Sequence, residues 1–267
     1  MLKKSDLIVP NWPAPKNVHA LQTNRLNGVS LAPYDSLNLG SHVNDNTIHV
    51  AQNRQLLRQL LPIEPVWLNQ VHGINVLNLD DINAAKFDSV PTADASFTSH
   101  KNVVCVTMTA DCLPILICDS AGTHVASIHA GWRSLCDGVI EATIAKMATD
   151  SSQLLAWLGP AIGPDAFEVG SEVRAQFITQ DAQAQAAFRP QAAINPQTKQ
   201  PQPEKWLGNI YQIATQRLNK LGVTQIYGGG ISQNQSEYWC TFSQKDQFFS
   251  YRRDGITGRM ATLIWLG

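Results

Sequence analysis

Three apolar, strand-like runs of the sequence each end close to a soft metal ligand. The runs are VWLNQVH (66–72), VVCVTMTADC (103–112) and HVASIHAGWR (124–133), and the ligands are His72, Cys112 and His129. Two imidazoles and one thiolate suit catalytic zinc, because the fourth tetrahedral position stays open for water or substrate. No C-x-x-C or H-x-x-x-H spacing joins the three residues. The ligands therefore have to converge from distant segments through the fold.

The length and composition of the chain favour one globular domain. The sequence has 267 residues, of which 44% are hydrophobic and 15% charged, and this balance suits a large core. It shows no internal repeat and no linker that would separate two domains. We predict a single catalytic domain over residues 1–267.

The charge distribution argues against polymer and membrane partners. The net charge is −1, without a basic run that would bind nucleic acid or anionic lipid. No apolar run is long enough to span a membrane, and the N-terminus lacks the apolar segment of a signal peptide. The five cysteines are odd in number and mostly lie in apolar strands, which indicates reduced thiols and a cytoplasmic location. A small-molecule partner is favoured.

The pattern of apolar residues predicts a mixture of helices and strands without regular βαβ alternation. The predicted helices are 47–61, 135–148, 171–179 and 206–221. The predicted strands are 65–71, 74–79, 103–109, 114–119, 124–129, 154–158, 223–227 and 260–266, with a hairpin at Asp254–Gly255 and a loop or weak helix at 180–205. This mixture indicates an α+β fold of layered α/β type, in which helices flank mixed sheets.

Two of the three ligands have ordinary structural explanations when taken alone. His72 precedes Gly73 and could be a hydrogen-bonded histidine of a tight turn. Cys112 could be a packed thiol, which is the role we expect for Cys105 and Cys118 inside their strands.

The segment around His129 is harder to explain by packing. Gly131 would let the backbone approach a ligand closely, Trp132 offers an aromatic face, and Arg133 offers a fork for phosphate or carboxylate. We expect Ser134 to cap the following helix, which would place His129 and Arg133 near a helix N-terminus that favours anions.

The remaining candidates are arginines and isolated histidines. Arg252 and Arg253 either pair with carboxylates or bind an anion, and Arg54 either faces the same anion or is a solvated helix residue. Five histidines lack the context of a ligand and are expected to be structural or exposed: His19, His42, His49, His100 and His124.

Together these segments resemble the laccase-domain, or YfiH-like, family. Members of this family carry the names purine nucleoside phosphorylase, multicopper polyphenol oxidase and peptidoglycan editing factor. The matching text is SLNLG (36–40), NR (53–54), NQVHG (69–73), ADASFTS (93–99), TADCLPILICD (109–119), ASIHAGWRS (126–134), WLGPAIGPDAFEVGSEV (157–173), CT (240–241) and FFSYRRDGITGRMATLIWL (248–266). The chain departs from the family pattern at HVNDN (42–46) and at Gly208–Asn209.

The resemblance implies a zinc centre made by His72, Cys112 and His129. It also implies phosphorolysis of adenosine, inosine and S-methyl-5′-thioadenosine, together with deamination of adenosine, in a monomer or homodimer. Zinc lowers the pKa of bound water to about 7, which suits attack on a purine ring carbon.

Roles for the neighbouring residues follow from this chemistry. Asp111 is the candidate for proton transfer or for orienting a ligand. Arg133 is the candidate that acts on phosphate, and Arg54, Trp132 and Arg252 are candidates for substrate binding.

Other classes of function stay open on sequence grounds. A His2Cys site can also hold Cu²⁺, with Met108 as an axial ligand, although a multicopper oxidase needs more imidazoles than seven histidines supply. A metal-free hydrolase or amidase that edits peptidoglycan precursors would use Cys112 as nucleophile and His129 as base. Such a dyad has no need of His72. A non-catalytic binding module is a further alternative.

Overall fold

The computed structural model describes residues 2–81, 89–191, 205–229 and 239–267, in which the strands form three sheets. The largest sheet is mixed, with parallel pairs at both edges and antiparallel pairs in the centre. In spatial order its strands are β11 (Gln225–Gly228), β7 (Leu154–Leu158), β5 (Leu113–Asp119), β6 (Val125–Ala130), β3 (Ala95–Thr98) and β2 (Val76–Asn78). This architecture confirms the predicted α+β class.

Two smaller antiparallel sheets complete the strand layers. One consists of β1 (Val18–Gln22), β12 (Met260–Leu266) and β4 (Cys105–Thr109). Its strands β4 and β12 pack against β5 and β6 of the large sheet. The other consists of β8 (Glu168–Gly170), β10 (Lys205–Gly208) and β9 (Phe188–Pro190).

Alternating side chains of β5 show how the large sheet is covered on both faces. Ile115 and Ile117 belong to the apolar core under the helices. Leu116 and Cys118 belong to the core between the sheets. Because successive residues of a strand point to opposite faces, a strand with both faces covered is apolar throughout.

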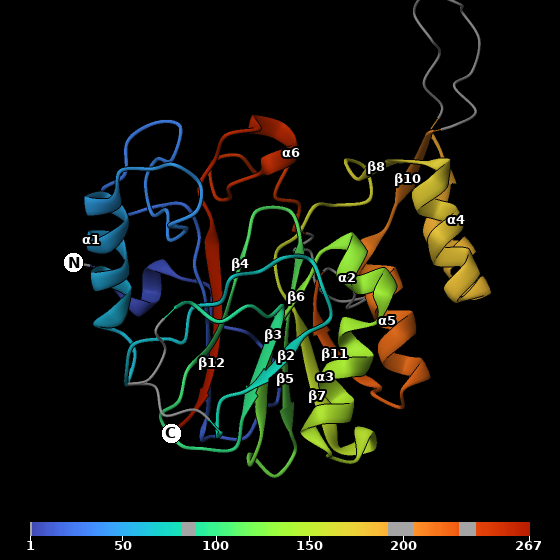
Figure 1. The fold of residues 1–267 in the computed structure, drawn as a ribbon, viewed down its shortest axis with the longest axis horizontal. Helices are drawn as coiled ribbons and strands as arrows, with labels where there is room; N and C mark the ends of the chain where they lie inside the picture. The colour runs from blue at the N-terminus through green and yellow to red at the C-terminus, as the bar shows by residue number, and fades with distance from the viewer. Residues whose placement is uncertain (1, 82–88, 192–204, 230–238) are drawn as a thin grey trace, which may run out of the picture.

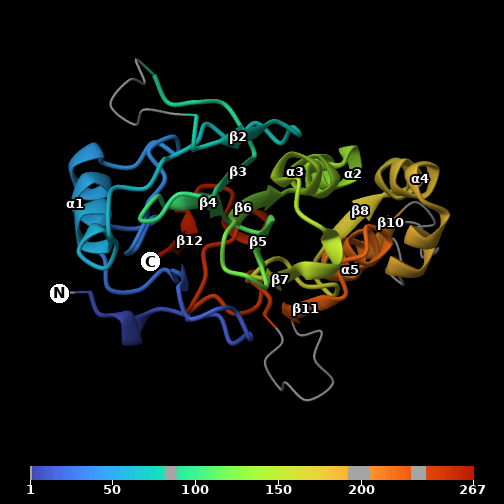
Figure 2. The ribbon, with the colours of Figure 1, turned by 90° about the horizontal axis from the view of Figure 1, so that it is seen from below.

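The helices lie on two sides of the sheets. Figures 1 and 2 place α1 beside the sheet of β12, and α3 and α5 on the opposite side of the molecule. The α-helices are α1 (Thr47–Arg58), α2 (Trp132–Asp137), α3 (Val139–Met147), α4 (Ser171–Gln180), α5 (Ile210–Lys220) and α6 (Tyr251–Asp254). The 3-10 helices among the described residues are η1 (Lys4–Asp6), η3 (Ser151–Gln153) and η4 (Ala182–Ala187). Within the described ranges, none of the helices combines the length and the apolar character needed to cross a membrane.

The predicted helix at 135–148 is divided into α2 and α3. Gly138 lies between them with φ 102°, a left-handed conformation that glycine adopts without steric cost. The predicted N-cap at Ser134 is wrong. Gly131 is the N-cap residue, and Ser134 Oγ donates to the carbonyls of His129 and Gly131, each at 3.1 Å.

Other predicted elements also need correction. Residues 205–208 form β10 rather than the start of a helix, and α5 begins only after Asn209, whose side chain accepts a hydrogen bond from Gln212 N. The expected hairpin at Asp254–Gly255 is the end of α6.

The segments 65–71 and 180–205 differ from prediction as well. In 65–71 only isolated bridges form, at Val66 and Asn69. The segment 180–205 contains η4 and β9, and its residues 192–204 lie outside the described ranges.

Candidate metal centre and active site

Strand pairing brings the three predicted ligands to one edge of the large sheet. Antiparallel β5 and β6 place Leu113 opposite Ala130, so Cys112, just before β5, lies beside His129 at the end of β6. In parallel β2 and β3, Val76 pairs with Ala95. The loop before β2, which carries His72, therefore reaches the same edge. The strand order thus brings together three residues that lie in distant segments of the sequence.

The three side chains form a compact cluster. Their ligand atoms all lie within 4.8 Å of one another, and His72 Nε2 is 3.6 Å from Cys112 Sγ. The rings of His72 and His129 are 4.8 Å apart with an edge-on arrangement of 68°. His72 is exposed, Cys112 is half-buried and His129 is buried. The cluster thus has one open side.

The donor set fits a tetrahedral zinc ion. Zinc bonds of the usual lengths to a sulfur and a nitrogen separate the two ligand atoms by about 3.5 Å in a tetrahedron. The observed distance of 3.6 Å between Cys112 Sγ and His72 Nε2 agrees with this value. In His129 the hydrogen bond at Nδ1 leaves Nε2 available as a ligand. Within the described ranges, this is the single group of three or more such residues.

A buried carboxylate holds two of the ligands. Asp94, which is fully buried, accepts a hydrogen bond from His129 Nδ1 at 2.9 Å. It also accepts hydrogen bonds from the backbone amides of His72 at 2.9 Å and Gly73 at 2.7 Å. These bonds hold His72 in a left-handed conformation with φ 60°. A carboxylate behind a histidine ligand fixes its orientation and tautomer, so Asp94 has the position of a supporting residue.

Asp94 was not identified from sequence reasoning. The ADASFTS segment was part of the family resemblance, but nothing in its spacing linked Asp94 to a histidine 35 positions away.

Gly131 lets the backbone pass directly beneath the cluster. A Cβ atom at this position would lie 2.5 Å from His72 Cδ2 and 3.2 Å from Cys112 Sγ. Both contacts are tighter than ordinary packing allows, so only glycine fits between the backbone and the His72 and Cys112 side chains.

Cys112 and His129 form a strongly interacting thiol–imidazole pair. Burial raises the pKa of the Cys112 thiol, but the positive charge of His129 and hydrogen bonds from both histidines lower it to about 6. Burial lowers the pKa of His129, while the charge of Cys112 and the hydrogen bond to Asp94 raise it to about 9. A deprotonated sulfur is the form that binds metal or acts as a nucleophile.

The cluster lies in a cavity of about 560 Å³. Its walls combine apolar side chains with several cations. The lining residues are His42, Gln70, His72, Met108, Thr109, Ala110, Asp111, Cys112, His129, Trp132, Arg133, Ile162, Phe167, Ile210, Tyr251, Arg252 and Arg259. A volume of this size lies within the range of pockets that hold small-molecule ligands.

Trp132 and Arg133 stand at the start of α2 and line the cavity. The guanidinium of Arg133 lies 4.4 Å from the centre of the Trp132 ring. Arg133 is exposed and Trp132 half-buried, which places the pair at the mouth.

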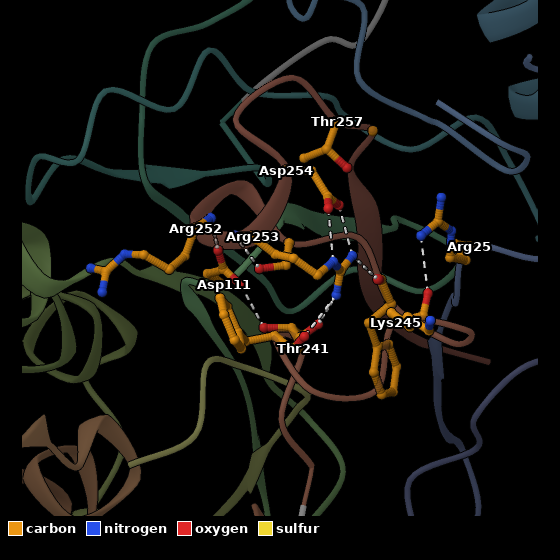
Figure 3. A network of polar contacts seen from close by, with 12 residues as sticks. Arg25, Asp111, Thr241, Lys245, Arg252, Arg253, Asp254 and Thr257 are labelled. Carbon is orange, nitrogen blue, oxygen red and sulfur yellow. Dashed lines mark hydrogen bonds and ion pairs between the residues drawn. The ribbon is translucent and has the colours of Figure 1, made fainter. Parts of the chain in front are cut away.

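Asp111 lies in the cavity wall with its carboxylate engaged by two donors. Oδ1 accepts a hydrogen bond from Thr241 Oγ1 and Oδ2 accepts one from the backbone amide of Arg252, both at 2.6 Å (Figure 3). Asp111 has φ 92° where the chain turns from β4 into β5. These bonds tie that turn to α6.

The side chain of Arg252 lines the cavity but is bound to the protein. Its Nη1 donates to the carbonyls of Glu168 at 2.9 Å and Ala166 at 3.4 Å. Figure 3 shows this side chain extending away from Asp111.

Arg54 is not among the residues that line the cavity. Its Nε donates to the carbonyl of Leu39 at 3.0 Å, and its guanidinium lies 3.9 Å from the centre of the Trp67 ring. Burial lowers the pKa of Arg54 to about 10. Arg54 thus binds the segment that precedes His42, and its charge helps to lower the pKa of His42.

Two basic residues of the cavity, His42 and Arg259, were missed by sequence reasoning. His42 was placed among the structural or exposed histidines, and Arg259 was not singled out at all. Arg259 lies in the GITGRM text of the family resemblance, which was the one available signal. Neither residue occurs in a recognisable ligand spacing, and both reach the cavity through long-range contacts.

Comparisons with known proteins agree with this arrangement. A family model described as Multi-copper polyphenol oxidoreductase laccase matches residues 19–267. A protein of Escherichia coli strain K12 named Purine nucleoside phosphorylase YfiH is 51% identical over 264 residues, covering 98% of this chain and 99% of the relative. A Purine nucleoside phosphorylase of Haemophilus influenzae is 49% identical over 260 residues, covering 97% and 98%.

A solved structure shows the same fold. The crystal structure of a Neisseria meningitidis protein superposes with a TM-score of 0.86 at 44% sequence identity. The match covers 98% of this chain and 99% of that one.

Proposed function

Because this chain belongs to the YfiH-like purine nucleoside phosphorylase family, we propose that it is a zinc-dependent enzyme that cleaves purine nucleosides with phosphate. The proposed substrates are adenosine, inosine and S-methyl-5′-thioadenosine, with deamination of adenosine as a second activity. The names of the relatives support phosphorolysis. The chemistry of the donor set supports zinc.

The observation that carries the proposal is the position of the His72, Cys112 and His129 cluster in the wall of a cavity that also carries cations. Apolar side chains such as Ile162, Phe167 and Ile210 line another part of the wall. A purine nucleoside has an apolar ring face and a polar sugar, and phosphate is an anion. The cavity offers complementary surfaces for each.

Phosphorolysis exchanges one bond for another. A phosphate oxygen bonds to C1′ of the ribose while the bond from C1′ to the base nitrogen breaks. The electron pair of that bond stays on the base, which takes up the proton that hydrogen phosphate gives up. Zinc, when bound, would supply a Lewis acid.

The residues of the chain would orient this reaction. Asp94 would hold the His129 ring with Nε2 toward the metal and fix the loop of His72. Trp132 would stack on the nucleoside, and Arg133 would reach phosphate from the mouth of the cavity. Arg252 would support the cavity wall by binding the carbonyl of Glu168. Arg54 would act indirectly, by holding the segment at Leu39 through its carbonyl.

For Asp111 the contacts favour a positioning role over proton transfer. Both of its carboxylate oxygens already accept hydrogen bonds from the protein, one from Thr241 and one from the amide of Arg252. A proton carrier would have to exchange one of these bonds for a substrate contact. Asp111 would instead fix the turn before Cys112.

A Cys–His hydrolase is the second candidate, and the direct pairing of Cys112 with His129 favours it. Such a dyad gives no reason for a third donor, His72, 3.6 Å from the sulfur. A multicopper oxidase receives less support, because the parts of the chain that the structure describes contain one group of potential metal ligands rather than several. Zinc is therefore preferred to Cu²⁺.

The proposed place of action is the cytoplasm, since all five cysteines are free thiols. No feature of the proposal requires more than a monomer, and a homodimer is compatible with it.

The decisive experiment is product analysis with zinc-loaded protein. Adenosine is incubated with and without phosphate, and the products are separated by chromatography. Adenine with ribose 1-phosphate, formed only when phosphate is present, is the expected result. Inosine alone would restrict the activity to deamination, and the absence of both products would contradict the proposal.

Two variants separate the metal enzyme from the Cys–His hydrolase. His72→Ala should lose activity and zinc, whereas His124→Ala, which replaces a histidine of the β5–β6 turn, should keep both. Full activity of His72→Ala, together with an acyl group trapped on Cys112, would favour the hydrolase.

A further inference from the structure

Two sequence motifs that supply no metal ligand lie behind one corner of the cavity and support Arg259, which lines it. These motifs are SLNLG (36–40) and NR (53–54). Asn53, which is fully buried on α1, donates from Nδ2 to the carbonyl of Ser36 at 3.0 Å and that of Asn38 at 2.9 Å. The motifs thus fix the backbone of residues 36–40 against α1.

The same segment holds Arg259 from both sides. The Arg259 amide donates to Asn38 Oδ1 at 2.8 Å, and the Leu39 amide donates to the Arg259 carbonyl at 3.1 Å. Gly40 packs against the stem of Arg259, because a Cβ atom there would lie 2.8 Å from Arg259 Cγ. The position of the Arg259 side chain is therefore determined by this segment.

The guanidinium of Arg259 is fixed but keeps free donors. Its Nη1 donates to the carbonyls of Thr257 and Gly258, each at 3.0 Å. Over the described ranges, Nε and Nη2 have no acceptor, and no carboxylate forms an ion pair with this side chain. An arginine carries five N–H donors in a planar fork. Arg259 lines the cavity and so offers unused donors to a ligand there.

The other arginines near the cavity are less suited to hold an anion. Arg54 does not line it. Arg252 also lines the cavity and, like Arg259, uses Nη1 on two backbone carbonyls, but Arg252 is exposed whereas Arg259 is half-buried. Arg133 is exposed at the mouth and stacks on the neighbouring indole. Arg259 alone among these four is half-buried in the cavity wall while keeping unused donors.

His42 adds a donor beside this corner. It follows Gly40 by two residues, lines the cavity and is exposed at its mouth. Burial lowers the pKa of His42, and the positive charges of Arg259 and Arg54 lower it further, so His42 offers a neutral N–H donor. The guanidinium charges of Arg259 and Arg54 both act on this corner, which makes it attractive to an anion.

We infer that Arg259, assisted by His42, binds the phosphate that attacks the nucleoside. This inference rests on the proposed function and assigns the main phosphate contact to Arg259, with Arg133 at the mouth of the cavity as a secondary contact. The fork of Arg259 would hold two phosphate oxygens and leave a third free to attack C1′. The nucleoside would then lie between this corner and the apolar wall.

The test compares phosphate binding and phosphate kinetics in the zinc-loaded protein and its Arg259→Gln variant. We expect the KM for phosphate to rise at least about tenfold, as for the loss of a charge-assisted hydrogen bond, and the KM for nucleoside to stay within about twofold. Zinc content should not change. A phosphate KM close to that of the unchanged protein would overturn the inference.

A second variant, Gly40→Ala, keeps the positive charge of Arg259 and tests whether misfolding explains the effect of Arg259→Gln. Gly40→Ala would push against Arg259 Cγ and displace the guanidinium while leaving it positive. Gly40 has no left-handed φ, so alanine fits its backbone. We expect the Gly40→Ala variant to raise the phosphate KM as well. The matched control is Arg189→Gln, which removes one charge from an exposed ion pair with Asp165, and should leave the phosphate KM unchanged.

A binding readout makes the inference independent of turnover. Phosphate that binds the folded protein should raise its melting temperature in a concentration-dependent manner. We expect this rise in the unchanged protein and in Arg189→Gln, and its loss in Arg259→Gln. If no nucleoside is cleaved but the rise depends on Arg259, the proposed function fails and the anion site stands. A rise that persists in Arg259→Gln, or no rise in the unchanged protein, overturns the anion site.

Discussion

The carboxylate of Asp94 joins the ring of His129 to the loop that carries His72. Oxygen Oδ1 lies 2.9 Å from His129 Nδ1 and 2.9 Å from the His72 amide nitrogen. One buried atom therefore determines the ring orientation of one proposed ligand and the backbone position of another.

Asp94→Asn should weaken zinc binding. An amide can still accept one of these hydrogen bonds, but it lacks the negative charge that makes the His129 ring a better donor to metal. Loss of such a supporting carboxylate typically costs about 10- to 100-fold in metal affinity. The affinity is measured by competition with a chromophoric chelator.

The control for this change is Asp119→Asn. Asp119 also accepts backbone amides, from Thr123 and His124, in the turn between β5 and β6. The Asp119→Asn variant should leave the affinity for zinc unaltered. Equal affinities of the two variants would show that Asp94 does not support the metal centre.

Gly131→Ala should disrupt the cluster with a single methyl group. The added Cβ would meet His72 Cδ2 at 2.5 Å, so the exposed His72 ring has to move. Overpacking of this kind typically costs about 1–3 kcal/mol, and here we expect the effect mainly as lost zinc affinity and activity.

Gly73→Ala is the matched control for Gly131→Ala, because its Cβ would lie an ordinary 3.5 Å from Asp94 Oδ2. Its zinc content by mass spectrometry should equal that of the unchanged protein. A Gly131→Ala variant with full zinc content and activity would contradict the close packing described for the cluster.

Metal-free protein should show an unusually acidic thiol. Since the pKa of Cys112 is about 6, its reactive thiolate appears as the pH rises through about 6 rather than at the ordinary value. The rate of alkylation by iodoacetamide at Cys112, followed by peptide mass spectrometry, should rise over this range. Burial raises the pKa of Cys105 and Cys118 to about 12, so these thiols should stay unmodified.

His129→Asn provides the comparison for this titration. Without the positive charge of His129, the alkylation midpoint of Cys112 should move upward, and zinc should protect the thiol in the unchanged protein only. A midpoint that is the same in both proteins would show that His129 does not activate the sulfur.

The strand pattern could be predicted because its signals are local, since the apolar runs of β4, β5 and β6 are continuous. The three proposed ligands could be selected together only through the family resemblance. The helix predicted over 206–221 shows the limit of such signals. Residues 205–208 pair with β8 and β9, and this tertiary pairing decides their conformation.

The supporting and anion-binding residues depend on contacts between distant segments. Arg259 reaches its place through a bond to Asn38, 221 positions earlier in the chain. Asp94 meets His129 only because β3 pairs with β6. Composition and spacing carry no information on such register, so His42, Asp94 and Arg259 emerge only from the coordinates.

Asp111→Asn distinguishes a positioning role from proton transfer. Asparagine tolerates the left-handed φ of 92° at this position. Its carbonyl can accept from the Arg252 amide, and its NH2 group can donate to Thr241 Oγ1. We expect kcat within about fivefold of the unchanged enzyme, since general acid–base catalysis would contribute about 10²- to 10⁴-fold. Asp111→Ala, which leaves both partners unpaired, should lower the free energy of unfolding by about 1–3 kcal/mol. A loss of more than about 100-fold in kcat for Asp111→Asn, with an unchanged melting temperature, would assign the proton transfer to Asp111.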